Sequence, residues 1–150
     1  ESVPGVSSFC AAAASLGIEY TLPDVSQSVI ITRVAGRTPV PERASIRSYA
    51  MHKSTTVVFL SPSRVDDLQR ELLAGGYSED TPAAVVYKAS WKEEKKMVCT
   101  VATLSKTVRD AGIKNSALMI IGDCVTHKNY MKSKLYDETF STEFRMAKTK

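Results

Sequence analysis

Five short runs of apolar and β-branched residues recur along this chain of 150 residues, with helix-like segments between most of them. A run of four to eight such residues is typical of a strand that is covered on both faces of a sheet. Strands that alternate with helices favour an α/β fold. The predicted strands are 28–34, 56–60, 83–88, 97–102 and 117–121.

The segments between these runs carry helix signals. In the alanine-rich stretch 8–16, Ser7 or Ser8 is suited to cap the amino terminus, and Gly17 suits the left-handed position after the last turn. The residues before it, ESVPGVSS, suggest the end of a strand and a turn. Three further helices are predicted: one near 42–51, one that starts at Ser63 and stops at Gly75-Gly76, and one over 103–112.

The strands at 83–88 and 97–102 are joined by the polar loop SWKEEKK, which suggests a hairpin. The other strands are separated by helices and are expected to be parallel. The predicted fold is therefore α/β, a single domain with a mixed, mostly parallel sheet of about five strands flanked by helices. Neither an internal repeat nor a linker divides the chain.

Composition indicates a globular protein of a reducing compartment, with 43% hydrophobic and 24% charged residues. We expect a cytoplasmic location without membrane contact, because no apolar run approaches the roughly 20 residues that span a bilayer and no signal peptide is evident. Cys10, Cys99 and Cys124 are odd in number and have apolar neighbours, as buried thiols do. With two histidines and no Cys-x-x-Cys motif, no metal site is predicted.

The net charge of +4 is concentrated in residues 126–150, which hold six Lys and Arg against three Asp and Glu. A basic segment of this kind can attract nucleic acid. Its aromatic residues do not alternate with the cations as a base-stacking surface requires. We therefore interpret 126–150 as a solvated, partly irregular tail and expect no nucleic-acid partner.

No self-contained catalytic motif is present: G-x-S-x-G, G-x-x-x-x-G-K-[ST] and G-x-G-x-x-G are all missing. The paired carboxylates Asp66-Asp67 and Glu93-Glu94 fall on stretches that read as solvated faces. Ligands of α/β sheets collect outside the carboxyl ends of the strands. The segments 34–37, 60–61 and 87–89 follow strands, and the helix start near Ser8 offers free backbone N–H groups. Together they predict one rim that faces one ligand.

A family resemblance is carried by four segments, PGVSSFCAAAASLGIEYTLPDVSQSVIITRVAGRTPVPE, VVFLSPS, GGYSEDTPAAVVYKASWKEEK and SALMIIGD. In this order, over roughly residues 3–123, they resemble the C-terminal part of the tetrapyrrole methylases. The stretches TR-x-x-GRTPVPE and VVYKASW are similar to those of the subgroup that methylates C-11 of precorrin-4 or cobalt-precorrin-4 in cobalamin biosynthesis.

The resemblance implies an S-adenosyl-L-methionine-dependent C-methyltransferase, a homodimer, whose two α/β domains hold the cofactor between them and release S-adenosyl-L-homocysteine. Its tetrapyrrole substrate carries many carboxylates, and Arg33 and Arg37, with Lys88, are candidates to pair with them. No general base is nominated. The cofactor-binding residues that the resemblance implies are Ser7, Ser8, Phe9, Leu60, Tyr87, Lys88, Ala89 and Ala117.

The chain departs from the family in one respect. The N-terminal domain of the family carries a GDP-x-x-x-YG-type loop, whereas the only Gly-Asp pair here is Gly122-Asp123. We therefore expect residues 1–125 to be the C-terminal domain, 126–150 its tail, the N-terminal domain to be absent, and the chain to be inactive alone. Two alternatives stay open: another tetrapyrrole C-methyltransferase of the pathway, or a non-catalytic interaction or dimerisation module.

Overall fold

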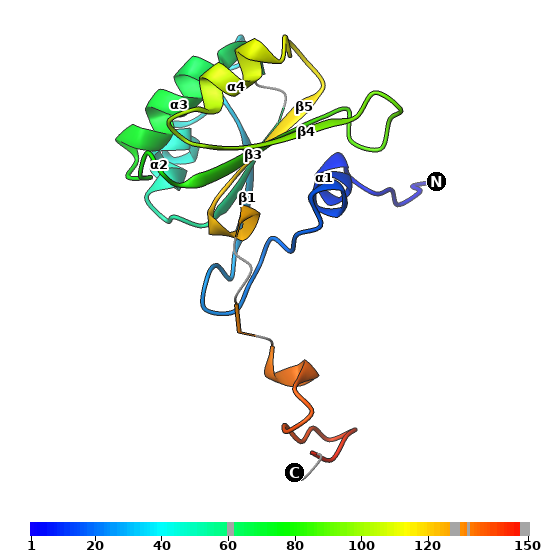
Figure 1. Cartoon of the computed structure of the whole chain (residues 1–150). Helices are drawn as coiled ribbons and strands as arrows, with labels where there is room; N and C mark the ends of the chain where they lie inside the picture. Colours follow the sequence, from blue (N-terminus) through cyan, green and yellow to red (C-terminus); the bar gives the residue numbers. More distant parts are fainter. Residues whose placement is uncertain (60–61, 127–129, 132, 148–150) are drawn as a thin grey trace.

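The computed structural model describes residues 1–59, 62–126, 130–131 and 133–147. All five predicted strands are present and form one sheet in the order β1-β2-β5-β3-β4 (Figure 1). The described strands are β1 (Val29–Arg33), β2 (Thr55–Phe59), β3 (Pro82–Tyr87), β4 (Lys95–Thr100) and β5 (Ala117–Ile121).

The expectation of a mostly parallel sheet was wrong. Only β1 and β2 are parallel, while β5 is antiparallel to both β2 and β3, and β3 is antiparallel to β4. The hairpin β3–β4 reverses the chain, and the helix α4 (Leu104–Asp110) then crosses the sheet once. Strand β5 therefore runs in the direction of β4 and enters the sheet between two strands that point the other way. Apolar runs cannot reveal this, because buried strands of both directions are apolar throughout.

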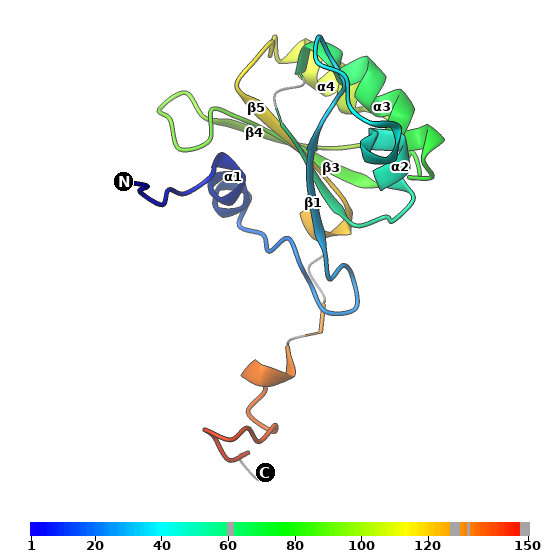
Figure 2. The same cartoon turned by 180° about the vertical axis from the view of Figure 1, so that it is seen from behind.

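Helices cover the two faces of the sheet unequally. Helix α1 (Ser8–Leu16) lies alone on one face, and α2 (Ile46–Ala50), α3 (Val65–Ala74) and α4 lie on the other (Figures 1 and 2). Under α1, the core contains Ala12, Val57 and Ile120. The larger core beneath the three helices contains Leu68, Leu72, Leu104 and Met119, among others. Successive residues of a strand therefore face opposite sides of the sheet and pack into two separate cores.

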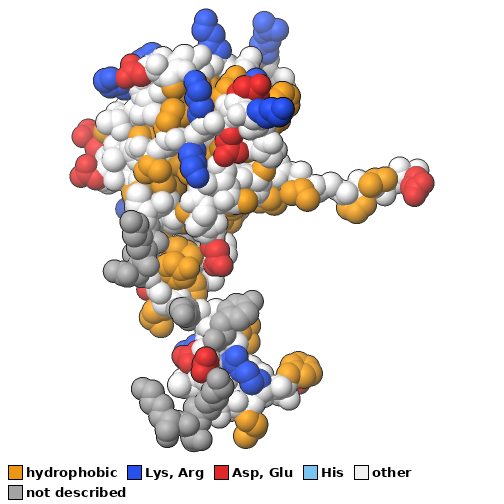
Figure 3. Space-filling view, turned by 45° about the vertical axis from the view of Figure 1, so that its right-hand side comes forward, with side chains coloured by type: hydrophobic (Ala, Val, Ile, Leu, Met, Phe, Trp, Pro, Cys, Tyr) orange, Lys and Arg blue, Asp and Glu red, His pale blue; other side chains and the backbone are white. Residues whose placement is uncertain are grey.

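Helix α1 matches its prediction residue for residue, and Gly17 ends it with φ of +66°. Ser7 occupies the N-cap position, but its side chain makes no capping bond. Residues 1–7 contain no strand, against the prediction, and project from the body of the molecule (Figure 3). Strand β4 begins two residues earlier than predicted, because its pairing with β3 sets Thr100 opposite Pro82.

The described part of the tail leaves the body as irregular chain with one short turn at Lys134–Tyr136 (Figure 1). The Arg145 guanidinium organises it by donating to the carbonyls of Leu135 and Asp137 at 3.1 and 2.6 Å. In the described residues, none of the helices is both long and apolar enough to cross a membrane.

We predict that Gly75→Ala destabilises the fold, because α3 approaches α2 closely at this point. An added Cβ would lie 2.4 Å from the Ala50 Cβ and 2.5 Å from the Arg47 carbonyl oxygen. Overpacking of this kind costs about 1–3 kcal/mol of unfolding free energy, which urea denaturation measures. Gly5→Ala is the control, since no atom of the described residues lies within 4 Å of its added Cβ. Equal stability of the two variants would contradict the packing argument.

Candidate functional site

At one edge of the sheet, the ends of strands that run in opposite directions lie side by side. Strands β1, β2 and β3 point the same way, so their carboxyl ends meet at this edge. Because β5 is antiparallel to its neighbours, its amino end lies at the same edge, where Ala117 pairs with Tyr87. The rim predicted from the sequence is therefore assembled from β1, β2, β3 and the start of β5.

A cavity of about 170 Å³ opens at this edge, between the start of α1 and the sheet. Phe59, Val86 and Leu118 form its floor, since the strand register places them side by side on the face that α1 covers. Its walls are mostly apolar, with few polar groups, as is usual for sites that bind small organic molecules. The lining residues are Ser8, Phe59, Val86, Lys88, Ala89, Trp91, Ser116, Ala117 and Leu118.

The backbone around the cavity adopts an uncommon conformation. Lys88, Ser90 and Ser116 have φ angles of +47°, +70° and +52°, in the region that favours glycine. Each such residue costs roughly 1–3 kcal/mol, and residues of this kind cluster at ligand sites. The Lys88 N–H donates to the Ser116 carbonyl at 2.8 Å, which joins the end of β3 to the start of β5. The rest of the fold thus maintains a strained backbone beside the cavity.

Among the lining residues that the structure describes, Lys88 carries the single positive charge. Its ammonium lies 5.1 Å from the centre of the Trp91 ring, 5.4 Å from that of Tyr87, and 3.9 Å from Oε2 of Glu93. Cation–π contacts at these distances hold the ammonium over the rings. The lysine side chain is 26% exposed and can still reach a ligand.

The Glu93-Glu94 pair was predicted to lie on a solvated face, but Glu94 is held by hydrogen bonds within the protein. One of its carboxylate oxygens accepts from the Ser15 hydroxyl of α1, and the other accepts from the Ser90 N–H at 2.7 Å. These two donors lower the pKa of the Glu94 carboxyl below its ordinary value. Lys96 adds a second contact by donating to the Ser15 carbonyl at 2.5 Å. The β3–β4 loop is therefore attached to the end of α1.

The eight predicted cofactor-binding residues fall into three groups. Ser8, Lys88, Ala89 and Ala117 line the cavity. Ser7, Phe9 and Tyr87 are their neighbours in sequence and do not line it; the Phe9 carbonyl instead accepts from the Tyr20 hydroxyl at 2.7 Å. Leu60 lies outside the residues that the structure describes.

Sequence reasoning missed Phe59, Val86, Trp91, Ser116 and Leu118. Side chains alternate between the two faces of a strand, but this pattern alone does not bring Val86 and Leu118 together. The antiparallel register sets them opposite each other. Trp91 carried a visible signal, because it is the single tryptophan of the chain and lies in the loop that follows β3. Its side chain is 63% exposed, which is unusual for a large aromatic residue.

A second cavity of about 550 Å³ lies at the carboxyl end of β1 and holds Arg33 and Arg37, the two predicted substrate-binding residues, together with Arg64. The Arg33 guanidinium donates to the carbonyls of Thr38 and Pro39 at 3.1 Å each and to that of Val34 at 3.4 Å. These bonds fix its orientation, and none of the described residues supplies a carboxylate that neutralises its charge. The remaining described lining residues are Val34, Gly36, Thr38 and Ser63.

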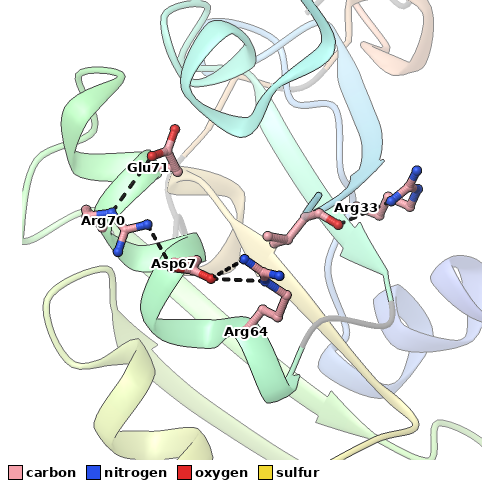
Figure 4. Close-up of polar contacts among 6 residues, drawn as sticks. Arg33, Arg64, Asp67, Arg70 and Glu71 are labelled. Atoms are coloured by element: carbon pink, nitrogen blue, oxygen red, sulfur yellow. Dashed lines mark hydrogen bonds and ion pairs between the residues drawn. The ribbon is translucent and has the colours of Figure 1, made fainter. Parts of the chain in front are cut away.

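Arg64 is held by a carboxylate of α3. Asp67 accepts from Arg64 at 2.6 Å and from Arg70 at 2.7 Å (Figure 4). The Arg70 and Arg64 guanidiniums lower the pKa of Asp67 below its usual range. Glu71 also lies 3.9 Å from Arg70, so the charges of this α3 cluster balance. Among the described residues, Arg33 and Arg37 have no carboxylate partner and no acidic residue lines the cavity, so the cavity suits an anion.

The cysteines differ from one another in exposure. Cys124 is buried and Cys99 is half-buried, and burial raises the pKa of both thiols. Cys10 is exposed, against the expectation of a buried thiol, because it lies on the outward side of α1. Within the described ranges, the side chains of His, Cys, Asp and Glu form no group of three that could hold a metal ion.

Comparison with known sequences identifies relatives of the chain. Residues 1–105 match the family described as Tetrapyrrole (Corrin/Porphyrin) Methylases. The chain is 50% identical over all 150 residues to a cobalt-precorrin-4 C(11)-methyltransferase of Methanocaldococcus jannaschii, of which it covers 58%. Over 137 residues, 91% of the chain, it is 39% identical to a precorrin-4 C(11)-methyltransferase of Mycobacterium tuberculosis, of which it covers 55%. The chain thus spans little more than half the length of these relatives.

Solved structures agree with this comparison. The X-ray structure of a cobalt precorrin-4 methyltransferase matches with a TM-score of 0.81 and 44% identity, over 83% of this chain and 52% of that one. A uroporphyrin-III C-methyl transferase of Thermus thermophilus, complexed with S-adenyl homocysteine, matches with a TM-score of 0.66 and 23% identity, over 83% and 53%. The second likeness concerns the fold alone.

Proposed function

Because the chain belongs to the tetrapyrrole (corrin/porphyrin) methylases, we propose that it forms part of an S-adenosylmethionine-dependent enzyme that methylates C-11 of precorrin-4 or cobalt-precorrin-4 in cobalamin biosynthesis. The observation that carries the proposal is the cavity at the carboxyl edge of the sheet, where four of the residues implied by the family meet. The 50% identity to a cobalt-precorrin-4 C(11)-methyltransferase supports the choice of substrate.

We assign the cofactor to this cavity. Its apolar floor of Val86 and Leu118 suits an aromatic base, and the strained backbone around Ala89 and Ser116 presents polar groups at the rim. When bound, the cofactor supplies a methyl group that its sulfonium has already activated. The residues of this chain would orient the ligand and exclude water, which accounts for a site with few titratable groups.

The cavity is too small to enclose a whole cofactor. Pockets that bury small molecules usually measure about 300–1,000 Å³, against about 170 Å³ here. We therefore propose that residues 1–125 act as the C-terminal domain, and that the part of the relatives outside the match supplies the opposite wall of the cleft. By itself this chain would bind S-adenosylhomocysteine weakly, and nanomolar stoichiometric binding in calorimetry would contradict that proposal.

A chimera tests the activity. In it, the chain replaces the matching 58% of the Methanocaldococcus jannaschii relative, and methyl transfer to cobalt-precorrin-4 and to precorrin-4 is followed by mass spectrometry. We expect C-11 methylation by the chimera. Ala89→Leu fills the cavity and is expected to raise the KM for S-adenosylmethionine at least about tenfold, a loss of about 1.4 kcal/mol in binding. Ala102→Leu, an exposed position at the opposite edge of the sheet, is the control. A chimera that methylates another tetrapyrrole would instead favour a different enzyme of the pathway.

We propose that Arg33 and Arg37 bind carboxylates of the tetrapyrrole. Support comes from their shared cavity of about 550 Å³, which Arg64 also lines. None of the described residues hydrogen-bonds to the Arg37 guanidinium, whereas Arg33 is held by its own loop. Arg37 is therefore the more available donor for a bidentate pair with a substrate carboxylate.

Arg37→Ala in the same chimera is expected to raise the KM for the tetrapyrrole about 10- to 100-fold, since charge-assisted hydrogen bonds contribute about 1.5–3 kcal/mol. The KM for S-adenosylmethionine should stay unchanged. Arg43→Ala removes an exposed arginine outside the cavity and controls for net charge. An equal rise in the KM for the tetrapyrrole in both variants would indicate general electrostatic attraction and would contradict a specific carboxylate site.

We further propose a homodimer, on the basis of apolar residues that α1 leaves uncovered. Ile31 on edge strand β1 and Val98 on edge strand β4 lie on the face that carries α1, and their side chains are 50% and 59% exposed. Exposed apolar area of this kind marks interaction surfaces. Light scattering at high concentration should give twice the mass of the 16.4 kDa chain. If the wild-type chain has the mass of a monomer, and Val98→Lys has the same mass, a dimer formed through this face is contradicted.

A further inference from the structure

Two neighbouring carboxylates, Glu93 and Glu94, have different roles in the loop between β3 and β4. Glu93 points toward the Lys88 ammonium at 3.9 Å and is 62% exposed. Glu94 accepts two hydrogen bonds, one from within its own loop and one from α1. The first bond, from the Ser90 N–H, satisfies a donor of a residue held at φ of +70°. Glu94 thereby stabilises the strained turn that places Ala89 and Trp91 at the cavity.

The second bond connects elements that are far apart in the sequence. Ser15 and Glu94 are 79 residues apart, yet the Ser15 hydroxyl donates to the Glu94 carboxylate. Lys96 donates to the carbonyl of the same Ser15. Among the described residues, these two hydrogen bonds connect α1 to the β3–β4 hairpin, and both involve the last turn of α1. We call the Ser15–Glu94 contact, with Ser90, the α1–loop link.

The α1–loop link joins the two walls of the cavity. The loop contributes Lys88, Ala89 and Trp91, and α1 contributes Ser8. Ser8 lies at the other end of the same nine-residue helix, about 10 Å from Ser15 along its axis. A helix moves as a rigid rod over this length, so the position of its last turn determines where its first turn can lie.

The apolar contacts of α1 provide little resistance to sliding. Its sheet-facing side is formed by Ala12 and Ala13, with Phe9 and Leu16 at the ends. Small side chains interlock with few neighbours, so several helix positions bury similar apolar area. Directional hydrogen bonds select one of these positions.

We propose that Glu94 is a positioning residue for the cofactor cavity: it holds the strained 88–90 turn and, through Ser15, fixes the distance between the α1 wall and the loop wall. The identity of the ligand rests on the proposed function, whereas the link itself does not. Glu94 touches neither cofactor nor substrate in this account and acts through Ser8, Ala89 and Trp91.

The test is a double-mutant cycle with Ser15→Ala and Glu94→Ala in the full chain, followed by nuclear magnetic resonance. S-adenosylhomocysteine is titrated, and the amide shifts of Ser8 and Ala89 are recorded. We expect both amides to respond with one dissociation constant in the wild type. Ser15→Ala should weaken binding about tenfold, and Glu94→Ala at least as much, because it also releases the Ser90 turn. The double variant should bind no more weakly than Glu94→Ala alone, since both changes remove the same link.

Three controls distinguish positioning from loss of structure. Glu94→Gln retains acceptor oxygen and should recover part of the affinity, with an unchanged melting temperature. Hydrogen exchange of the Ser90 amide should accelerate in Glu94→Ala and remain slow in Ser15→Ala, since only the first variant removes its acceptor. Glu79→Ala removes a carboxylate before β3, at the opposite edge of the sheet, and should leave binding unchanged.

Failure has separate signatures for the two proposals. Unchanged affinity in both single variants, or losses that multiply to about 100-fold in the double variant, would overturn the positioning role and leave the cofactor site intact. A wild-type chain whose Ser8 and Ala89 amides do not respond to millimolar S-adenosylhomocysteine would overturn the cofactor assignment, and the positioning role with it. The Ser90 exchange rates would still report whether Glu94 holds the turn.

Discussion

Strand β5 lies between β2 and β3, antiparallel to both, and the rest of the sheet depends on this position. All five of its residues are buried, with Met119 facing the three-helix side and Ile120 facing α1. Full burial of such side chains contributes about 1.5–3 kcal/mol each, so β5 ties the two cores together. Gly122 follows it with φ of +135°, passes close to Thr55, and donates to the Pro82 carbonyl at 2.9 Å. This glycine lets the chain leave the middle of the sheet.

The direction of β5 determines what the ligand edge contains. A parallel β5 would bring a carboxyl end and the loop after it to this edge, whereas the antiparallel strand brings Ser116 and Ala117. Ser116 adopts φ of +52° and accepts the Lys88 N–H, so that two strand ends close over a small cavity with apolar walls. Recognition at such a site depends on shape and backbone groups. Such a site would suit the methyl transfer proposed above, in which the donor is already activated and needs to be positioned more than protonated.

The sequence predicted the elements well because each carries its own local signal. Ala11 to Ala14 with Gly17 defines α1, and the apolar run at 117–121 defines β5 to the residue. Strand direction has no such signal, because ALMII is equally compatible with parallel and antiparallel neighbours. The clustering of Ser8, Lys88, Ala89 and Ala117 was predicted through the family resemblance. The role of Val86 and Leu118 depends on register, and the environment of Glu94 depends on a contact with Ser15, 79 residues away. Neither is visible in local sequence.

The alanines of α1 let the helix lie close to the sheet but provide few contacts that hold it in position. Ala12 is fully buried against the sheet, so the helix lies close enough to the strands for Ser8 to border the cavity. The same small side chains provide few interlocking contacts, so the orientation of α1 depends on polar contacts near its two ends. At one end the Tyr20 hydroxyl donates to the Phe9 carbonyl at 2.7 Å, and burial raises the pKa of Tyr20 above its ordinary value. At the other end Ser15 meets Glu94. A helix that can approach a ligand closely on an alanine surface therefore requires hydrogen bonds at both ends to hold it in place.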